Sequence, residues 1–331
     1  MNDTPSTPPP GHRARRPAPT TRAAPVEVSV VVPAFNEGDN LAPLVDALGR
    51  ILGRCTATFE IVIVDDGSRD RTDAILSELS GRFDFVRPIR LSRNFGKEAA
   101  MGAGLQDAYG DCVIFIDADL QHPPELIPEM LSRWRAGADV VNAVKRNRGR
   151  ESLFYRAFSG TFNRIMSSAI GTDIRNASDY KLIDRQVASA LLACPERNRF
   201  FRGLVAWVGF REENLLFDVQ KRNAGTSKWG LLSLARYSLR NVVAFSSLPL
   251  IGVAYAGFFV VLMGMLLLLQ TLYNYASGHA LSGFTTVIVV QILLSGMILF
   301  GLGIIAIYIA RMYEEQKSRP LFLIRTLRQK D

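Results

Sequence analysis

Apolar residues in the first half of the chain occur in short continuous runs, with longer segments of helical spacing between them. Four runs predict buried β-strands: VSVVVPA, EIVIVDD, CVIFIDAD and DVVNAV. Segments such as NLAPLVDALGRIL and RTDAILSEL have the spacing of amphipathic helices. Apolar strands that alternate with helices usually form a parallel sheet with both faces covered, so the pattern predicts an α/β domain.

The same domain is predicted to continue to residue 228. Amphipathic stretches such as LFYRAFSGTFNRIMSSAI follow the last apolar run, and the basic loop QKRNAGTSKWG comes at the end. We therefore expect one domain over residues 26–228 and an amphipathic juxtamembrane helix over 229–248. Residues 1–25 are rich in Pro, Thr and Arg without apolar periodicity, which predicts a disordered basic tail rather than a secretory signal.

Two long apolar segments follow, at residues 249–272 and 286–310, and neither contains a charged residue. A bilayer crossing needs about 20 predominantly apolar residues, so both segments are predicted to span a membrane as a hairpin. The connection between them has no Lys or Arg, whereas both outer flanks are basic, including the tail 311–331. The positive-inside rule then places both termini and the α/β domain in the cytoplasm. The flanking basic residues are Lys228, Arg236 and Arg240 before the hairpin, and Arg311, Lys317, Arg319, Arg325 and Arg328 after it.

Composition narrows the classes of partner. The 331 residues carry a formal net charge of +8, which suits an anionic partner such as a nucleic acid, a phosphorylated ligand or a membrane surface. Nucleic acid fits poorly, because the basic residues gather around the hairpin without interleaved aromatic residues. The three cysteines form no CxxC pair, so neither a disulfide framework nor a zinc site is indicated. Histidine is equally scarce, which leaves acid–base chemistry to carboxylates.

Polar residues follow three of the predicted strands directly. Ligands bind beyond the carboxyl ends of strands in open α/β sheets, so these polar residues are expected to meet at one edge. Asp117 and Asp119 point to the same side of an extended chain, and their charges repel unless a cation lies between them. With Gln121 they offer oxygen ligands to Mg²⁺ or Mn²⁺. The alternative is an acidic turn that caps a helix starting at Pro123.

The other two strand ends leave similar alternatives open. Asp65 and Asp66 could accept hydrogen bonds from a base or ribose, or could serve as turn and N-cap residues. Asn36 and Glu37 are more polar than a turn requires. The chain has no GxxxxGK[ST] motif and no G-x-G-x-x-G after a strand, which argues against a P-loop NTPase or a dinucleotide oxidoreductase.

Six motifs, in order, carry a resemblance to a known family. They are VVVPAFNEGDNL, EIVIVDDGSRDRT, LSRNFGKEAAMGAGL, DADLQHPPELIPEM, SDYKLIDRQV and RNAGTSKWG. Together they resemble the family-two inverting glycosyltransferases with a GT-A fold, and more narrowly the polyprenyl-phosphate glycosyltransferases related to dolichyl-phosphate mannose synthase. The hairpin and RMYEEQKSRPLFLI look most like the bactoprenol glucosyltransferases of bacteria. The resemblance covers roughly residues 27–324.

The resemblance implies roles for individual residues. Asp117, Asp119 and Gln121 would bind Mg²⁺ or Mn²⁺ on the diphosphate of a sugar nucleotide. Asp119 and Asp179 are the catalytic candidates. The nucleotide pocket would comprise Pro33, Phe35, Asn36, Glu37, Val64, Asp65, Asp66 and Ala118, and the phosphate and acceptor contacts would come from Lys145, Arg202, Arg222 and Lys228. Lys145 stands where relatives often carry Arg. A lysine there would lose the bidentate contact that an arginine makes with phosphate.

The implied reaction transfers a hexose to a polyprenyl phosphate at the cytosolic face of the bacterial inner membrane. The second pKa of a phosphate monoester is about 6, so the acceptor is already ionised, and Asp179 is expected to position it more than to deprotonate it. The resemblance favours glucose from UDP-glucose and a homotetramer. GDP-mannose or an amino-sugar donor remains an alternative, as does a non-catalytic nucleotide-sugar binder. A processive polysaccharide synthase is disfavoured because the chain lacks its Q-x-x-R-W motif and further spans.

Overall fold

The computed structural model describes residues 25–145, 179–194, 196, 201–217, 248–277 and 284–325. Its centre is a seven-stranded sheet of order β3-β2-β1-β4-β6-β5-β7. All the strands are parallel except β6, which runs antiparallel to both β4 and β5. The strands are β1 Val28–Ala34, β2 Phe59–Asp65, β3 Val86–Arg90, β4 Cys112–Phe115, β5 Val140–Lys145, β6 Lys181–Asp184 and β7 Glu212–Phe217. This mostly parallel, GT-A-like sheet confirms the predicted fold class.

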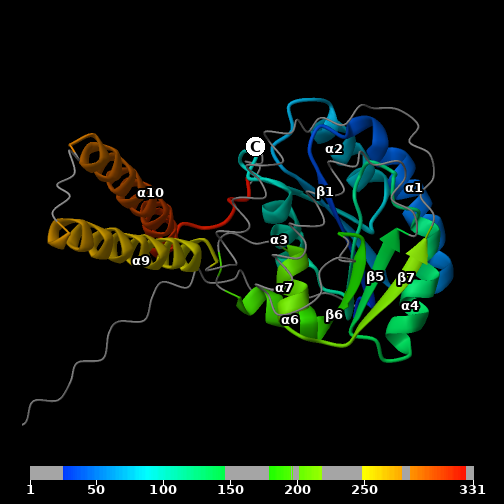
Figure 1. The fold of residues 1–331 in the computed structure, drawn as a ribbon. Helices are drawn as coiled ribbons and strands as arrows, with labels where there is room; N and C mark the ends of the chain where they lie inside the picture. Colours follow the sequence, from blue (N-terminus) through cyan, green and yellow to red (C-terminus); the bar gives the residue numbers. More distant parts are fainter. Residues whose placement is uncertain are drawn as a thin grey trace, which may run out of the picture.

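Helices cover both faces of the sheet (Figure 1). One face carries α1, α2 and α4, and the other carries α3, α6 and α7. The helices are α1 Gly38–Cys55, α2 Thr72–Arg82, α3 Lys97–Asp107, α4 Ile127–Arg135 (preceded by the short 3₁₀ helix η1, Pro124–Leu126), α6 Arg185–Ala193 and α7 Phe201–Trp207.

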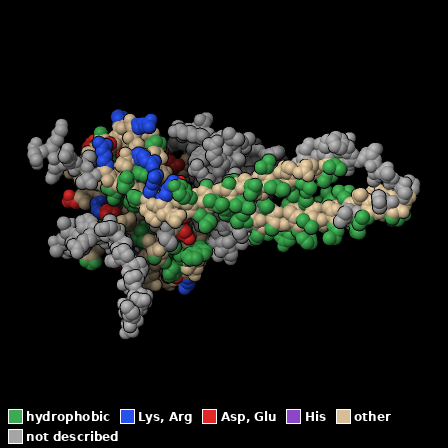
Figure 2. Space-filling model, turned by 90° about the vertical axis from the view of Figure 1, so that its left-hand side faces the viewer, with side chains coloured by type: hydrophobic (Ala, Val, Ile, Leu, Met, Phe, Trp, Pro, Cys, Tyr) green, Lys and Arg blue, Asp and Glu red, His purple; other side chains and the backbone are tan. Residues whose placement is uncertain are grey.

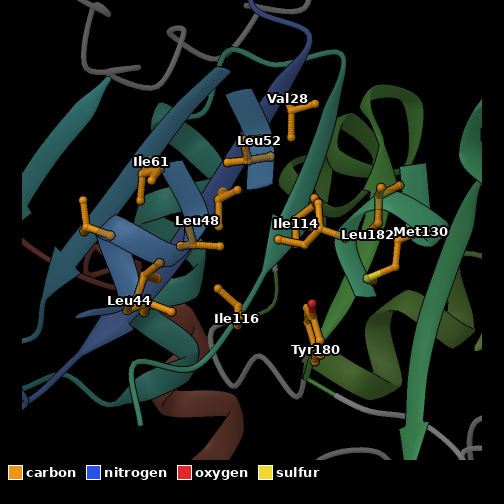
Figure 3. Packing of buried hydrophobic residues seen from close by; sticks show 14 of the residues in the cluster. Val28, Leu44, Leu48, Leu52, Ile61, Ile114, Ile116, Met130, Tyr180 and Leu182 are labelled. Carbon is orange, nitrogen blue, oxygen red and sulfur yellow. The ribbon is translucent and has the colours of Figure 1, made fainter. Parts of the chain in front are cut away.

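The spacing of apolar residues explains how each helix meets the sheet. In α1, Leu44, Leu48 and Leu52 recur every four residues and are fully buried. Figure 3 shows them gathered with Ile61 of β2 and Ile114 of β4. Burying each leucine contributes about 1.5–3 kcal/mol, so this one stripe fixes α1 on the sheet.

The register of the strands defines one functional edge. Ala34, at the end of β1, pairs with Asp65, at the end of β2, and Asp65 pairs in turn with Arg90, at the end of β3. Because β6 is antiparallel, its first residue, Lys181, pairs with Phe115, the last residue of β4. Segments that follow β4 and segments that precede β6 therefore meet at the same edge.

Two long helices, α9 Leu248–Ala276 and α10 Phe284–Gln316, follow the α/β unit and pack against each other. Within them, Leu250–Asn274 and Leu293–Gln316 are long and apolar enough to cross a membrane, each with a mean hydropathy of 2.4. Figure 2 shows hydrophobic side chains covering the hairpin, while charged side chains gather on the α/β unit. The predicted spans 249–272 and 286–310 fall inside these helices. Residues 229–247, where the juxtamembrane helix was predicted, lie outside the described residues.

The segment after α10 returns to the α/β unit instead of ending as a free tail. Leu91, just past β3, forms an antiparallel bridge with Ile324. The Ser92 N–H donates to the Leu323 carbonyl at 2.8 Å, and Phe322 packs against the core cluster on the α3 side of the sheet. We call residues 322–325 the C-terminal strap. It joins the end of the α9–α10 hairpin to the functional edge of the sheet.

Candidate active site

The acidic turn after β4 brings together three side chains that could hold a metal ion. Asp117, Asp119 and His122 offer ligand atoms that all lie within 4.8 Å of one another. The chain reverses at Leu120, which adopts a left-handed conformation with φ 59°, and the Gln121 N–H donates to Asp119 Oδ1 at 3.1 Å. Strained backbone of this kind in a non-glycine residue is typical of functional turns.

The donors of this group fit a divalent cation. Carboxylate oxygens suit Mg²⁺ and Mn²⁺, and an imidazole nitrogen is acceptable to a transition metal such as Mn²⁺. His122 is 8% exposed, with Nδ1 3.8 Å from Asp117 Oδ2. It was not among the predicted ligands, although it directly follows Gln121 in the sequence. Gln121 joins the group through its backbone N–H, which donates to Asp119 Oδ1.

Asp179 lies at the same edge of the sheet as Asp117, because it precedes a strand that runs antiparallel to β4. It lies two residues before Lys181, and Asp117 lies two residues after Phe115, so both acids stand just beyond the last pair of the β4–β6 ladder. Arg202 of α7 makes a bidentate contact with the Asp179 carboxylate. Its Nε lies 2.5 Å from Oδ1, and a terminal nitrogen lies 2.8 Å from Oδ2. The structure thus brings together the predicted site residues Asp117 and Asp179, which are far apart in the sequence.

Lys97, the first residue of α3, joins the two acids. Its Nζ lies 2.6 Å from Asp117 Oδ1 and 2.8 Å from Asp179 Oδ2. Burial alone would raise the pKa of Asp179, but the charges and hydrogen bonds of Arg202 and Lys97 outweigh it and hold that pKa well below its usual range. Burial likewise opposes the charge on Lys97, yet Asp179 and Asp117 keep the Lys97 pKa above its ordinary value. Asp179 and Lys97 are therefore both charged at neutral pH.

Asp66 organises the loop that delivers Lys97. Its side chain is buried and accepts the N–H groups of Phe95 at 2.7 Å and Gly96 at 2.8 Å. Burial raises the pKa of Asp66 in spite of these two hydrogen bonds. Nearby, a Cβ on Gly67 would come within 2.5 Å of the Arg93 carbonyl carbon, so only glycine allows the turn after β2 to meet this loop.

The ends of β1 and β2 form the other half of the edge. Asn36, at φ 57°, donates its N–H to Ser68 Oγ at 2.9 Å, while its side-chain oxygen accepts the N–H of Arg69 at 2.9 Å. Asp65 Oδ1 accepts the N–H of Ser68 at 2.8 Å. These bonds tie the two strand ends into one rim.

The remaining predicted pocket residues take different positions along this rim. Phe35 is 41% exposed, whereas Val64 and Ala118 are buried in the cores. Pro33 lies in β1 opposite Val64. Glu37 is the N-cap residue of α1, and its Oε2 accepts a hydrogen bond from Asn40 at 2.6 Å. An exposed aromatic ring beside buried strand ends is a suitable surface for stacking a nucleobase.

The predicted phosphate-binding residues are only partly described. Lys145 ends β5, whose carboxyl end lies at the same edge, because β5 is antiparallel to β6 and parallel to β7. Arg202 forms an ion pair with Asp179, as described above. Arg222 and Lys228 lie outside the described residues.

Lys97 was absent from the predicted set, and so were two further charged residues next to the site. Glu98 is held near Phe201, whose N–H donates to its Oε2 at 3.0 Å, and burial together with the negative charge of Asp179 raises the Glu98 pKa to about 7. Lys181 is 1% exposed, its Nζ lies 5.7 Å from the centre of the Phe201 ring, and burial lowers its pKa to about 8. For Glu98 the only signal was its place beside Lys97 in FGKEAA, at the start of a helix-like segment.

The geometry and the comparisons agree on the class of protein. Residues 29–202 match the model of glycosyl transferase family 2, and the chain belongs to that family. It is a glycosyltransferase. The chain is 39% identical to an uncharacterised glycosyltransferase of Synechocystis over 91% of its own length and 96% of that protein. It is 34% identical to the bactoprenol glucosyl transferase of Shigella phage SfV over 92% of its length and 100% of that protein.

A solved structure, mannosyl-3-phosphoglycerate synthase from Rubrobacter xylanophilus, also matches. It is 19% identical, with a TM-score of 0.47, over 66% of this chain and 73% of that one.

Proposed function

We propose that this glycosyltransferase moves a glucosyl group from UDP-glucose to a polyprenyl phosphate, with inversion at the anomeric carbon. The observation that carries the proposal is the extent of the likeness to the phage bactoprenol glucosyl transferase. It covers 92% of this chain, so it includes the membrane hairpin as well as the α/β unit. A soluble acceptor would give no reason for the hairpin to accompany the site.

The site supports a displacement that needs no protein base. An oxygen of the lipid phosphate forms the new bond to the anomeric carbon, and the bond from that carbon to the nucleoside diphosphate breaks, with its electron pair leaving on the diphosphate. The second pKa of a phosphate monoester is about 6, so the nucleophile carries no proton that must be removed at neutral pH. Asp179, paired with Arg202 and Lys97, is a poor proton acceptor. In this proposal it orients cationic groups around the acceptor.

The proposed reaction uses Mg²⁺ or Mn²⁺, held by Asp117 and Asp119 with His122 or Gln121. Bound there, the ion would supply Lewis-acid stabilisation to the departing diphosphate. Charge from the protein would add to this through Arg202 and, by resemblance, through Lys145, Arg222 and Lys228. The nucleotide would lie along the rim formed by Phe35, Asn36, Asp65 and Asp66, with Pro33, Glu37, Val64 and Ala118 shaping the pocket.

The hairpin would hold this site at the cytosolic face of the inner membrane. Figure 1 shows both helices projecting to one side of the α/β unit, with the start of α9 and the end of α10 nearest to it. The strap fastens the end of α10 beside the functional edge. A lipid phosphate at the membrane surface would thus lie within reach of the site. By the same resemblance we propose that the protein assembles as a homotetramer.

A donor panel tests the proposal. The full-length protein in detergent is incubated with undecaprenyl phosphate, a divalent cation and labelled UDP-glucose, UDP-galactose, UDP-N-acetylglucosamine or GDP-mannose. We expect label in the organic phase from UDP-glucose, and none when the lipid is omitted. Preference for GDP-mannose or UDP-N-acetylglucosamine would show that mannose or the amino sugar is transferred in place of glucose. The absence of lipid product with every donor would overturn the proposal.

A further inference from the structure

The reaction outlined above does not explain why Lys97 also contacts Asp117, a candidate metal ligand. Lys97 makes two ion pairs with acids that have different proposed roles. Asp117 is a candidate metal ligand, and Asp179 is the carboxylate proposed to act near the lipid acceptor. A cation on a metal-binding carboxylate competes with the metal for the same oxygen. The pairing of Lys97 with Asp117 therefore bears on how readily a metal ion binds there.

The two acids depend on Lys97 to different degrees. Asp179 already has Arg202, which contacts both of its oxygens. For Asp117, the only Lys or Arg in ion-pair contact among the described residues is Lys97, and His122 Nδ1 is 3.8 Å away. Lys97 is therefore the main counter-ion of Asp117, whereas on Asp179 it is the second of two.

The protein backbone places the ammonium there. Gly96, at φ 99°, is the N-cap residue of α3, and Asp66 fixes this turn through the N–H groups of Phe95 and Gly96. The strap holds the beginning of the same loop at Ser92. Beyond this fixed backbone, the lysine side chain is a flexible four-carbon stem that can change partners. Its side chain is 40% exposed, so such movement does not require the core to open.

We propose that Lys97 is the resident counter-ion of the metal site, and that it gives up Asp117 when the metal and the nucleotide diphosphate enter together. In the empty enzyme, Lys97 weakens metal binding by holding Asp117. The negative diphosphate of the donor attracts the ammonium away from Asp117 and frees that carboxylate for the metal. Metal and nucleotide then strengthen each other's binding beyond their direct contact, and by linkage the coupling is reciprocal. The metal half of this inference stands on its own, and the nucleotide half rests on the proposed function.

The test measures Mn²⁺ binding by electron paramagnetic resonance, with full-length protein in detergent and with or without UDP. For Lys97→Met we expect Mn²⁺ alone to bind about tenfold or more tightly than to the wild type, because one positive charge beside the site is gone. The gain in Mn²⁺ affinity produced by UDP should shrink by at least the same factor. Lys97→Arg, which keeps the charge, should bind Mn²⁺ close to the wild-type affinity.

Lys317→Met is the matched control, because Lys317 pairs with Glu314 at 3.0 Å at the end of α10, far along the chain from the site. It should leave Mn²⁺ binding unchanged. Should Lys97→Met unfold, as judged by circular dichroism, Lys97→Gln serves in its place. Wild-type or weaker Mn²⁺ affinity in the charge-removed variant would overturn the inference. Failure of UDP to bind the wild type at saturating Mn²⁺ would instead count against the proposed donor, and the comparison with Mn²⁺ alone would still decide the role of Lys97.

Discussion

Asp117 and Asp179 stand opposite each other just beyond the β4–β6 ladder, and the ammonium of Lys97 lies within 2.8 Å of both. The antiparallel course of β6 produces this arrangement. A parallel β6 would have placed Asp179, which precedes the strand, at the far edge of the sheet. One reversed strand thus joins the candidate metal ligands to the candidate acceptor-side carboxylate.

The first prediction concerns the role of Asp179. Because Arg202 and Lys97 hold its pKa well below the usual range, it stays ionised throughout pH 5.5–8.5 and contributes no limb to the pH–rate profile there. Asp179→Asn should slow transfer about ten- to hundred-fold, because Arg202 and Lys97 lose the carboxylate that they share, while the shape of the profile is unchanged.

A limb near pH 6 from the acceptor phosphate is expected in both proteins. A limb present in the wild type and absent in Asp179→Asn would contradict this account and make Asp179 a general base.

The second prediction concerns stability and pH at Glu98. Its pKa is raised from 4.5 to about 7 in the folded protein, so the folded state binds the extra proton. The stability that this proton provides is fully present below pH 4.5 and is lost as pH rises through 7. Glu98→Gln keeps an acceptor for the Phe201 N–H and removes the ionisation. Its stability relative to the wild type should therefore increase between pH 5 and pH 8, by about 1–3 kcal/mol.

Thermal unfolding at a series of pH values measures this difference. Glu78→Gln, on the exposed face of α2, is the control and should show no such pH dependence. A constant offset between Glu98→Gln and the wild type from pH 5 to 8 would contradict the prediction.

The third prediction concerns the C-terminal strap. Deleting residues 319–331 removes the partners of Leu91 and Ser92 but leaves α10 intact. Hydrogen exchange followed by mass spectrometry should show the amides of residues 91–97 exchanging about tenfold or more faster, since they lose a hydrogen bond and a packed aromatic ring. Amides of β1 should be unaffected.

Phe322→Ala tests the same idea without shortening the chain, because Phe322 packs against the core cluster on the α3 side of the sheet. Leu216→Ala, at an exposed apolar side chain of β7, is its control. Unchanged exchange at residues 91–97 in both strap variants would show that the strap does not hold the loop.

The fourth prediction concerns membrane topology. Ser277 follows α9, and Ser318 lies just after α10 on the side of the α/β unit. In intact cells a membrane-impermeant maleimide should label Ser277→Cys, whereas Ser318→Cys should need permeabilised cells. The protein used should lack Cys55, which is only half-buried; Cys112 and Cys194 are buried. The reverse labelling pattern would place the site away from cytosolic sugar nucleotides.

Much of the fold could be predicted because it follows from local pattern. The strands β1, β2, β4 and β5 and the hairpin are continuous apolar runs, and the polar residues after β1, β2 and β4 do share one edge. The strand β3, with the sequence VRPIR, was missed because a proline and two arginines break its apolar run. It lies at the edge of the sheet, where proline is tolerated.

The candidate site was harder to predict wherever long-range pairing determines it. No local pattern reveals that the four residues of β6 run antiparallel, and that direction is what brings Asp179 to Asp117. The role of Lys97 depends on the same pairing. The strap was read as part of a basic tail, because its pairing with Leu91 joins residues more than two hundred positions apart.

The most direct test of the central claim is transfer of labelled glucose from UDP-glucose to undecaprenyl phosphate, measured side by side in four samples. These are the wild type with Mg²⁺, the wild type with excess EDTA, Asp119→Asn, and Asp46→Asn as a control at an exposed acid of α1. The account predicts glucosyl lipid from the first and last samples at equal rates, with about hundredfold less or none from the other two, and recovery of the EDTA sample when Mg²⁺ or Mn²⁺ is restored. Undiminished glucosyl lipid from Asp119→Asn or from the EDTA sample would contradict it.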